Sequence, residues 1–243
     1  MKQMLLVMTL ALATLAVPRA HGGSVYDAAK DFSSTSNPTG VWSYGSSSTL
    51  GSAFNLDVSS ATVAGLNFWE GPISGVPPLT YPQIFHNGTG STITYAGTIQ
   101  MLPGQLALHP GPQDQYSVIQ FTSPAAGTYH LASLFTGIDF RGPTTTDVHV
   151  LLDGSAIFNG SVNGFGSGPS FATTLTLKAG DTVDFAVGFG SNGNYLFDST
   201  GITATLSSVP EPSTMVLALV GVLTLAGYAR FRRIRGCHTV CII

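Results

Sequence analysis

The segment between residues 24 and 208 contains no cysteine, because both cysteines of the chain, Cys237 and Cys241, lie near its C-terminal end. Without cysteine this segment cannot form a disulfide framework or a cysteine-ligated zinc site. Its histidines give no support for a zinc site either, since no two of them stand at metal-ligand spacing. We therefore expect the segment to fold around an apolar core without such cross-links.

Charged residues are also scarce, at 9% of the 243 residues, against about a quarter in an average globular domain. Between Ser24 and Ser208 three basic residues stand against eleven acidic ones, which leaves a net charge of −8. An acidic segment repels phosphate backbones, so nucleic acid is not an expected partner. The hydrophobic content of 44% argues against a disordered chain.

Common catalytic motifs are missing. The chain has neither a G-x-S-x-G nor an H-E-x-x-H pattern. Gly188 to Gly193 match G-x-G-x-x-G, but the helix that a dinucleotide site needs does not follow. Glu70 is the only glutamate of the segment, and no pair of carboxylates suited to glycoside hydrolysis is evident. We expect a non-catalytic protein, with a secreted polysaccharide-acting hydrolase as the alternative.

Residues 1–22 have the pattern of a secretory signal peptide. Lys2 supplies a short positive region, and an apolar stretch runs from Met4 to Val17. Ala20 and Gly22 are small residues placed for cleavage before Gly23. We predict that the protein is exported and loses residues 1–22.

Residues 213–231 are predicted to form a short membrane-spanning helix. Pro210 and Pro212 cannot lie inside a helix, and an uncharged run from Met215 to Ala229 follows them. At about 1.5 Å per residue this run is about 22 Å long, less than the ~30 Å of a bilayer core, which fits a temporary anchor. The cluster expected to stop transfer consists of Arg230, Arg232, Arg233 and Arg235. Residues 237–243 would then form a short cytoplasmic tail.

The order of "VPEPS", a short apolar span and "RFRRIR" resembles the PEP-CTERM sorting signal. The resemblance covers Val209 to Arg235 and implies that Pro210, Glu211 and Pro212 are the recognition residues. It also implies processing by an exosortase, a membrane-embedded enzyme of bacteria that make exopolysaccharide. Residues 209–236 would thus be a sorting and anchor segment. The expected route leads from an inner-membrane-anchored precursor to the cell surface or extracellular matrix.

Residues 23–208 are predicted to form an all-β ectodomain. In "DTVDFAVGF" the apolar residues Val183, Phe185 and Val187 alternate with Asp184, Ala186 and Gly188, the period of a half-buried strand. Asp153-Gly154 is a tight-turn pair between two such runs. Many strands with regular turn signals predict an antiparallel, jelly-roll-like β-sandwich.

Two further stretches, "DFSSTSNPTGVWSYG" and "GSNGNYLFDSTGITATL", are similar to a β-sandwich module found in other PEP-CTERM proteins. The activity of that module is not settled. The similarity therefore implies the fold of the ectodomain and not a mechanism.

Acidic and aromatic residues near turns are the candidate binding residues. Asp139, Asp147 and Asp198 are candidate calcium ligands, because calcium prefers carboxylate and carbonyl oxygens; the alternative is that they serve only as turn residues. Aromatic residues in or beside loops are candidates for stacking on sugars, the alternative being that they fill the core. These are Trp42, Tyr44, Trp69 and Tyr81. Combined with the export route that the sorting-signal resemblance implies, these rings lead us to expect a surface or matrix protein that binds polysaccharide.

Overall fold

The computed structural model describes residues 23–71, 82–210, 220–228 and 230. Gly23–Val209 form one compact unit, and the remaining terminal segments are grouped in a second. The predicted signal peptide and cytoplasmic tail lie outside the described residues, as do several predicted site residues. These are Tyr81, Glu211, Pro212, Arg232, Arg233 and Arg235.

The regular secondary structure of the first unit is almost entirely β-strand. In chain order they are β1 (Val25–Asp27), β2 (Trp42–Ser47), β3 (Asn55–Leu56), β4 (Ser59–Val63), β5 (Leu66–Glu70), β6 (Gln83–His86), β7 (Ile93–Tyr95), β8 (Ile99–Met101), β9 (Leu106–His109), β10 (Tyr116–Thr122), β11 (Gly127–Gly137), β12 (Asp147–Leu152), β13 (Ser155–Ser161), β14 (Ser170–Leu177), β15 (Thr182–Gly188) and β16 (Thr200–Ser208). A short 3-10 helix, η1 (Gly190–Asn192), lies between β15 and β16. The prediction of an all-β fold is confirmed.

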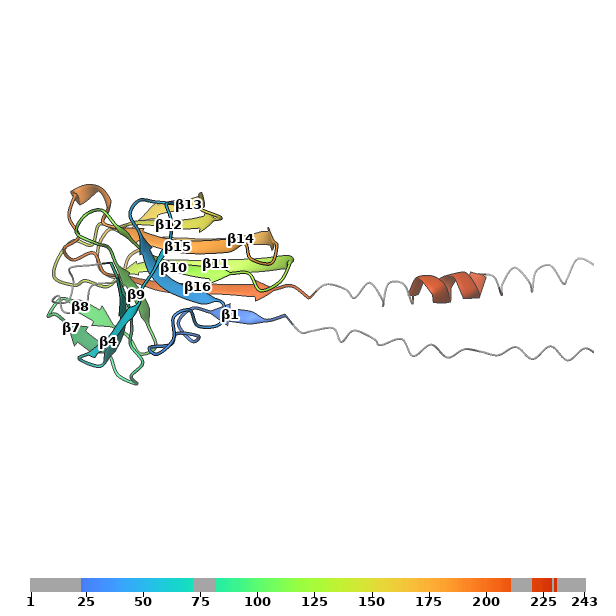
Figure 1. The fold of residues 1–243 in the computed structure, drawn as a ribbon, viewed down its shortest axis with the longest axis horizontal. Helices are drawn as coiled ribbons and strands as arrows, with labels where there is room; N and C mark the ends of the chain where they lie inside the picture. The colour runs from blue at the N-terminus through green and yellow to red at the C-terminus, as the bar shows by residue number, and fades with distance from the viewer. Residues whose placement is uncertain (1–22, 72–81, 211–219, 229, 231–243) are drawn as a thin grey trace, which may run out of the picture. The chain divides into compact units, whose positions relative to one another are not determined.

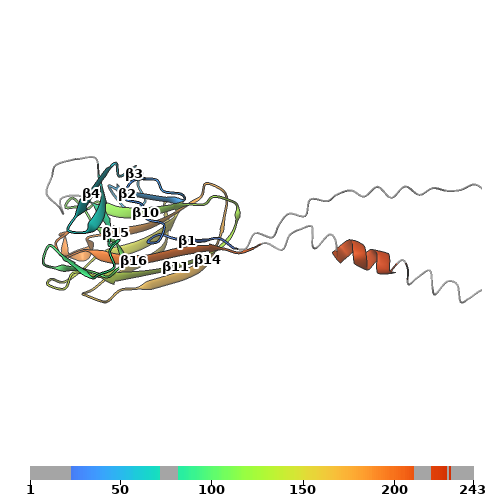
Figure 2. The ribbon, with the colours of Figure 1, turned by 90° about the horizontal axis from the view of Figure 1, so that it is seen from below.

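The strands form two main antiparallel sheets (Figures 1 and 2). The 8-stranded sheet has the order β14-β11-β16-β9-β6-β5-β4, with β1 also paired to β16. The 6-stranded sheet has the order β13-β12-β15-β10-β2-β3. From β9 onward the chain passes repeatedly between the sheets, so that β9-β16-β11-β14 faces β10-β15-β12-β13. This arrangement has the form of a jelly roll, extended by β4, β5 and β6 on one sheet and by β2 and β3 on the other.

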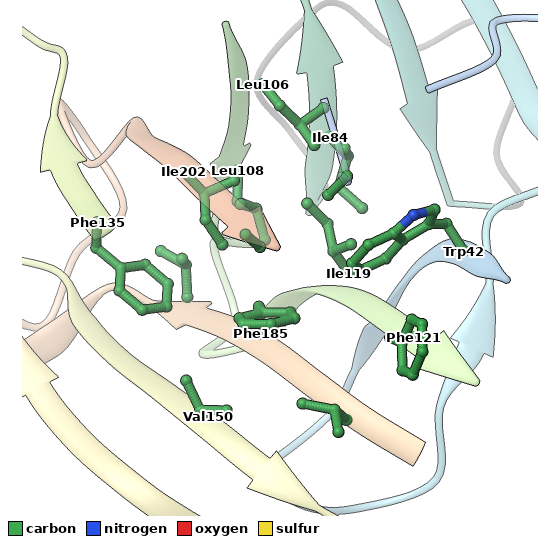
Figure 3. Packing of buried hydrophobic residues seen from close by; sticks show 14 of the residues in the cluster. Trp42, Ile84, Leu106, Leu108, Ile119, Phe121, Phe135, Val150, Phe185 and Ile202 are labelled. Atoms are coloured by element: carbon green, nitrogen blue, oxygen red, sulfur yellow. The ribbon is translucent and has the colours of Figure 1, made fainter. Parts of the chain in front are cut away.

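Strand alternation determines which side chains enter the core between the sheets. In β15, Val183, Phe185 and Val187 are all fully buried there, as the sequence pattern predicts. Figure 3 shows Phe185 of one sheet among Leu108 and Ile202 of the other. Each such side chain stabilises the fold by about 1.5–3 kcal/mol when it leaves water. The tight turn after β12 is also confirmed, since Asp153 and Gly154 both have positive φ angles, 47° and 75°.

The two chain ends of this unit lie together. Val25 of β1 pairs with Ser207 of β16, and the amide of Ser208 donates to the carbonyl of Ser24 at 2.8 Å. Strand β16 begins with Thr200 at the opposite end of the sandwich, which we call the distal end (left in Figure 1). Loops at the distal end therefore lie a full strand length away from Val209, where the chain leaves the unit.

A helix is described at residues 220–228. Within the described parts of the chain, no helix combines the length and the apolar character needed to cross a membrane. The predicted span over residues 213–231 includes residues outside the described ones.

We expect replacement of Trp42 by alanine to destabilise the sandwich strongly. The indole is fully buried and contacts Phe121 edge-on with ring centroids 5.4 Å apart, so its removal leaves a large cavity. The free energy of unfolding of a fragment of residues 23–209 should fall by about 3–5 kcal/mol. Urea denaturation followed by circular dichroism measures this change. Val58→Ala, at a residue that is 66% exposed, should change it by less than about 0.5 kcal/mol; equal losses would contradict the prediction.

Candidate functional site

Three loops meet at the distal end of the sandwich. They are residues 138–146 between β11 and β12, residues 162–169 between β13 and β14, and residues 189–199 between β15 and β16. Backbone hydrogen bonds join them: the amide of Gly164 donates to the carbonyl of Thr144 at 2.8 Å, and that of Ile138 to the carbonyl of Ser199 at 3.0 Å. The loops thus form one braced surface.

Each of these loops presents an exposed phenylalanine. Phe140, Phe165 and Phe197 are 40%, 49% and 37% exposed. The rings of Phe140 and Phe165 lie edge to face with centroids 6.2 Å apart, and the ring of Phe197 packs so closely on Gly142 that a Cβ there would overlap it. The Arg141 guanidinium lies 5.7 Å from the centroid of the Phe140 ring. We call Phe140, Phe165 and Phe197 the aromatic platform.

Buried carboxylates next to the platform residues join the loops that carry the platform. Asp139, next to Phe140, accepts hydrogen bonds from the Ser199 amide at 2.8 Å and from the Thr98 hydroxyl at 2.6 Å. Asp198, next to Phe197, accepts from the Thr145 amide at 2.8 Å. A buried acid thus ties two loops together while the adjacent ring points outward. Such bracing reduces the entropy that the rings lose when a ligand binds.

Burial raises the pKa of Asp198 to about 7; the Thr145 amide opposes this rise, and the Asp139 charge adds to it. Oδ2 of Asp198 has no hydrogen-bond partner in the described part of the chain. A protonated or partly protonated carboxyl at this position is therefore favoured at neutral pH.

The structure brings two of the three candidate calcium ligands close together. Asp139 and Asp198 interact electrostatically, whereas Asp147 belongs to a separate cluster. Asp147 accepts from the Tyr116 hydroxyl at 2.7 Å and from the Gly190 amide at 2.9 Å, and its Oδ2 lies 2.8 Å from Nε2 of His149. Among the described residues no three His, Cys, Asp or Glu side chains gather in a metal-binding group. Calcium at these aspartates therefore stays a prediction.

Three of the four predicted glycan-binding rings do not lie on the surface. Trp42 and Tyr44 in β2 are fully buried, and Trp69 in β5 is 5% exposed and donates from Nε1 to the Ser33 carbonyl at 2.6 Å. Strand alternation turns these rings toward the core, where no face is open to a sugar. The choice of Trp42, Tyr44 and Trp69 as stacking residues is therefore wrong, and Tyr81 lies outside the described residues.

Sequence reasoning missed the platform because it favoured tryptophan and tyrosine. Each platform residue stands next to a glycine or an aspartate in a loop, in "DFRG", "GFGSG" and "LFDSTG". An apolar ring in such a turn-forming context, outside an alternating strand, is the signal that would have indicated exposure.

The buried aspartates near the platform and at Asp57 do not form an accessible pair of carboxylates for acid catalysis. Asp139 and Asp198 are at most 1% exposed, and Asp57, which interacts with Glu70, is 1% exposed. A glycosidase needs two carboxyl groups that both reach the substrate. Asp57, Asp139 and Asp198 therefore do not provide the pair that the hydrolase alternative requires.

The C-terminal sequence matches a known protein-sorting signal. Residues 208–233 match the family of the PEP-CTERM protein-sorting motif. The chain carries a PEP-CTERM sorting motif. This motif contains Pro210, Glu211 and Pro212, as the sequence indicated, and it marks the chain as an exported protein.

A search of curated proteins finds no match to the chain. Among solved structures, the chain is similar to CBM51 from Clostridium perfringens GH95 in complex with methyl-galactose, at 14% identity and a TM-score of 0.33, covering 66% of this chain and 99% of that chain. It is also similar to a family 35 carbohydrate binding module from Clostridium thermocellum, at 12% identity and a TM-score of 0.29. This match covers 63% of this chain and 100% of that chain. A third similar structure is the CBM36-1 domain of a multidomain xylanase from the hindgut metagenome of Trinervitermes trinervoides, at 15% identity and a TM-score of 0.32. This match covers 53% of this chain and 97% of that chain. Similarities of this size carry no conclusion about a ligand of this chain.

We expect Asp198→Asn to change how stability depends on pH. The pKa of Asp198 is about 7 in the folded chain, against 3.8 for an ordinary aspartate. The unfolded state therefore loses its proton first, and the wild type loses stability as pH rises from about 4 to 7. Asparagine has no proton to lose, so the melting temperature of the variant should rise relative to wild type over that range. Thermal melts at half-unit pH steps measure the difference; parallel profiles would show that Asp198 titrates normally.

Proposed function

We propose that this chain is a non-catalytic cell-surface or matrix protein whose aromatic platform binds a neutral extracellular polysaccharide. The observation that carries the proposal is the exposure of Phe140, Phe165 and Phe197 on three cross-braced loops. Exposure of apolar side chains of this size to water is unfavourable in free energy. A group of them at one end of a domain therefore indicates a binding surface.

Sugar rings suit this surface chemically. The C–H face of a pyranose packs on an aromatic face, and polar groups beside the rings bond its hydroxyls. Asn192 and Asn194 lie in the loop that carries Phe197, where their side-chain oxygens accept from the amides of Asn194 and Leu196; the exposed amide nitrogen of Asn194 is the group proposed to bond a sugar hydroxyl. The net charge of −8 between Ser24 and Ser208 disfavours an anionic polymer. A neutral glycan is therefore the better ligand.

The position of the platform agrees with the route implied by the sorting motif. The motif begins where β16 ends, and the platform lies at the other end of β16. In the proposed precursor, residues 1–22 are removed, residues 213–231 form a temporary anchor in the inner membrane, and an exosortase recognises Pro210, Glu211 and Pro212. The platform is then at the end of the ectodomain away from its tether.

Binding by a single platform would be weak. Each stacked ring contributes about 1 kcal/mol, by analogy with aromatic pairs. A polysaccharide repeats its epitope, so many copies of the protein on one polymer or one surface give strong retention through multivalency. Such weak, repeated binding fits a matrix component.

We expect Phe140→Ala and Phe165→Ala each to weaken binding to a neutral polysaccharide by about fivefold, the equivalent of about 1 kcal/mol. Affinity electrophoresis of the full chain in detergent, in gels containing a β-glucan, a galactan or a mannan, measures the dissociation constant. Alginate serves as the anionic comparison.

Val58→Ala is the matched control, because Val58 is an exposed apolar residue outside the three loops. It should bind as the wild type does. Retention of both phenylalanine variants at wild-type strength would exclude the platform as the binding surface. Absence of wild-type binding to all the neutral gels would contradict the proposed ligand class.

We expect replacement of Pro210, Glu211 and Pro212 by alanine to block processing of the tail. The altered protein should stay with the membrane fraction at its precursor mass, whereas released wild-type protein should lack peptides from the segment after residue 212. Immunoblotting and mass spectrometry of membrane and released fractions measure both. His238→Ala, outside both the matched residues and the predicted sorting segment 209–236, is the control and should be processed normally. Recovery of the whole tail in released wild-type protein would contradict the proposal.

A further inference from the structure

A second group of buried oxygens lies at the corner where the chain crosses from one sheet to the other. Asp57 stands between β3, on the edge of the 6-stranded sheet, and β4, on the edge of the 8-stranded sheet. Its backbone is held on both sides: its amide donates to the Tyr44 carbonyl at 2.9 Å, and its carbonyl accepts from Nδ2 of Asn37 at 2.8 Å. The backbone of Asp57 is thus held in place, and the residue is 1% exposed.

The Asp57 carboxylate has no donor in the described part of the chain. Neither Oδ1 nor Oδ2 has a hydrogen-bond partner. An unpaired carboxylate that is shielded from water costs several kcal/mol, so native proteins neutralise or coordinate such a group. The basic residues of this unit do not pair with it, since the one Lys or Arg ion pair among the described residues joins Lys30 to Asp27.

More oxygen atoms approach the same corner from the neighbouring strands. Glu70 of β5 faces Ser59 of β4 on one side and Gln83 of β6 on the other. Nε2 of Gln83 donates to Oε2 of Glu70 at 2.9 Å, which leaves the buried Oε1 of Gln83 without a partner in the described residues. The Glu70 carboxylate is close enough to Asp57 that its charge adds to the effect of burial, and together they raise the pKa of Asp57 to about 8.

The unmet atoms of Asp57 and Gln83 are acceptors, and one buried donor near Glu70, the Tyr95 hydroxyl, also has no partner among the described residues. Asp57 lies two residues before Ser59, which pairs with Glu70, and Glu70 pairs with Gln83, so strand register places these three side chains on the same face of β5 and its neighbours. The Gln83 amide nitrogen is already used by Glu70. Water or a single proton on Asp57 would satisfy one or two of these acceptors, whereas a divalent cation satisfies all of them and cancels both charges. We propose that Asp57, Glu70 and Gln83 bind a divalent cation of the hard, oxygen-seeking class, with Ca²⁺ as the favoured ion.

The ligand set distinguishes among cations. Calcium accepts bidentate carboxylates, amide oxygens and backbone carbonyls in irregular geometry, whereas magnesium keeps several of its waters and needs a regular octahedron. Zinc prefers His and Cys; His109 is paired to Gln83 in register, and its Nε2 is also without a partner in the described chain. Zinc bound through His109 is therefore the competing outcome of the test. A calcium ion at this corner would join β4, β5 and β6 to the crossing segment.

The test is a calcium titration of the full chain, purified in detergent and stripped with EDTA. We expect calorimetry to detect binding of CaCl₂, and the melting temperature to rise by roughly 5 °C or more at 100-fold excess over the dissociation constant. Asp57→Asn should abolish both effects. Glu70→Gln, at a partly exposed position, should weaken binding at least tenfold and serves as the second variant if Asp57→Asn does not fold.

Asp114→Asn is the matched control, because it removes a carboxylate charge from an exposed loop, and it should respond to calcium as the wild type does. Three outcomes would overturn the proposal. The first is a wild-type chain that does not respond to CaCl₂. The second is a response that Asp198→Asn abolishes and Asp57→Asn leaves intact, which places calcium at the distal end. The third is a response to ZnCl₂ alone that His109→Gln abolishes.

Discussion

Burial of apolar side chains between the two sheets is the interaction on which the rest of this structure depends. Strands from distant parts of the sequence, such as β2 and β15, contribute Trp42 and Phe185 to one core. Because strand side chains alternate, a shift of one residue in any strand would move its apolar face into water. The core therefore fixes the register of every strand, and through it the positions of the loops that β11, β12, β13, β15 and β16 carry at the distal end.

Because basic residues are scarce, the charge of the buried aspartates must be neutralised or stabilised in other ways than by salt bridges. Lys30, Arg141 and Lys178 are the only ones between Ser24 and Ser208, so salt bridges cannot neutralise Asp57, Asp139 and Asp198. Asp139 relies on two hydrogen-bond donors, and Asp198 on an amide and a raised pKa. Asp57 has no hydrogen-bond donor among the described residues, and this is the basis for the cation proposed there.

Much of the fold was predictable from local pattern, and the site was not. Alternation in "DTVDFAVGF" and the Asp153-Gly154 turn depend on neighbouring residues, so one sequence suffices to recognise them. Whether Trp42 or Phe140 is exposed depends on which face of its strand or loop is covered by a strand distant in the sequence. Residue type alone therefore led to the wrong prediction that Trp42 stacks on a sugar. Pairing of Glu70 with Gln83 and proximity to Asp57 arise from register across three strands, which no short motif encodes.

The sorting motif and the platform impose complementary requirements on the two ends of β16. The strand must end at the start of the sorting motif, which begins at residue 208. It must begin next to the loop that carries Phe197. Tethering at one end leaves the other end free to meet a ligand, and hydrogen bonds along β1 and β11 hold β16 rigid between them. A rigid strand keeps the platform at a fixed distance from Val209, where the chain leaves the unit. Multivalent binding benefits from this, because rings held in fixed positions on many copies lose little further freedom when a polymer is bound.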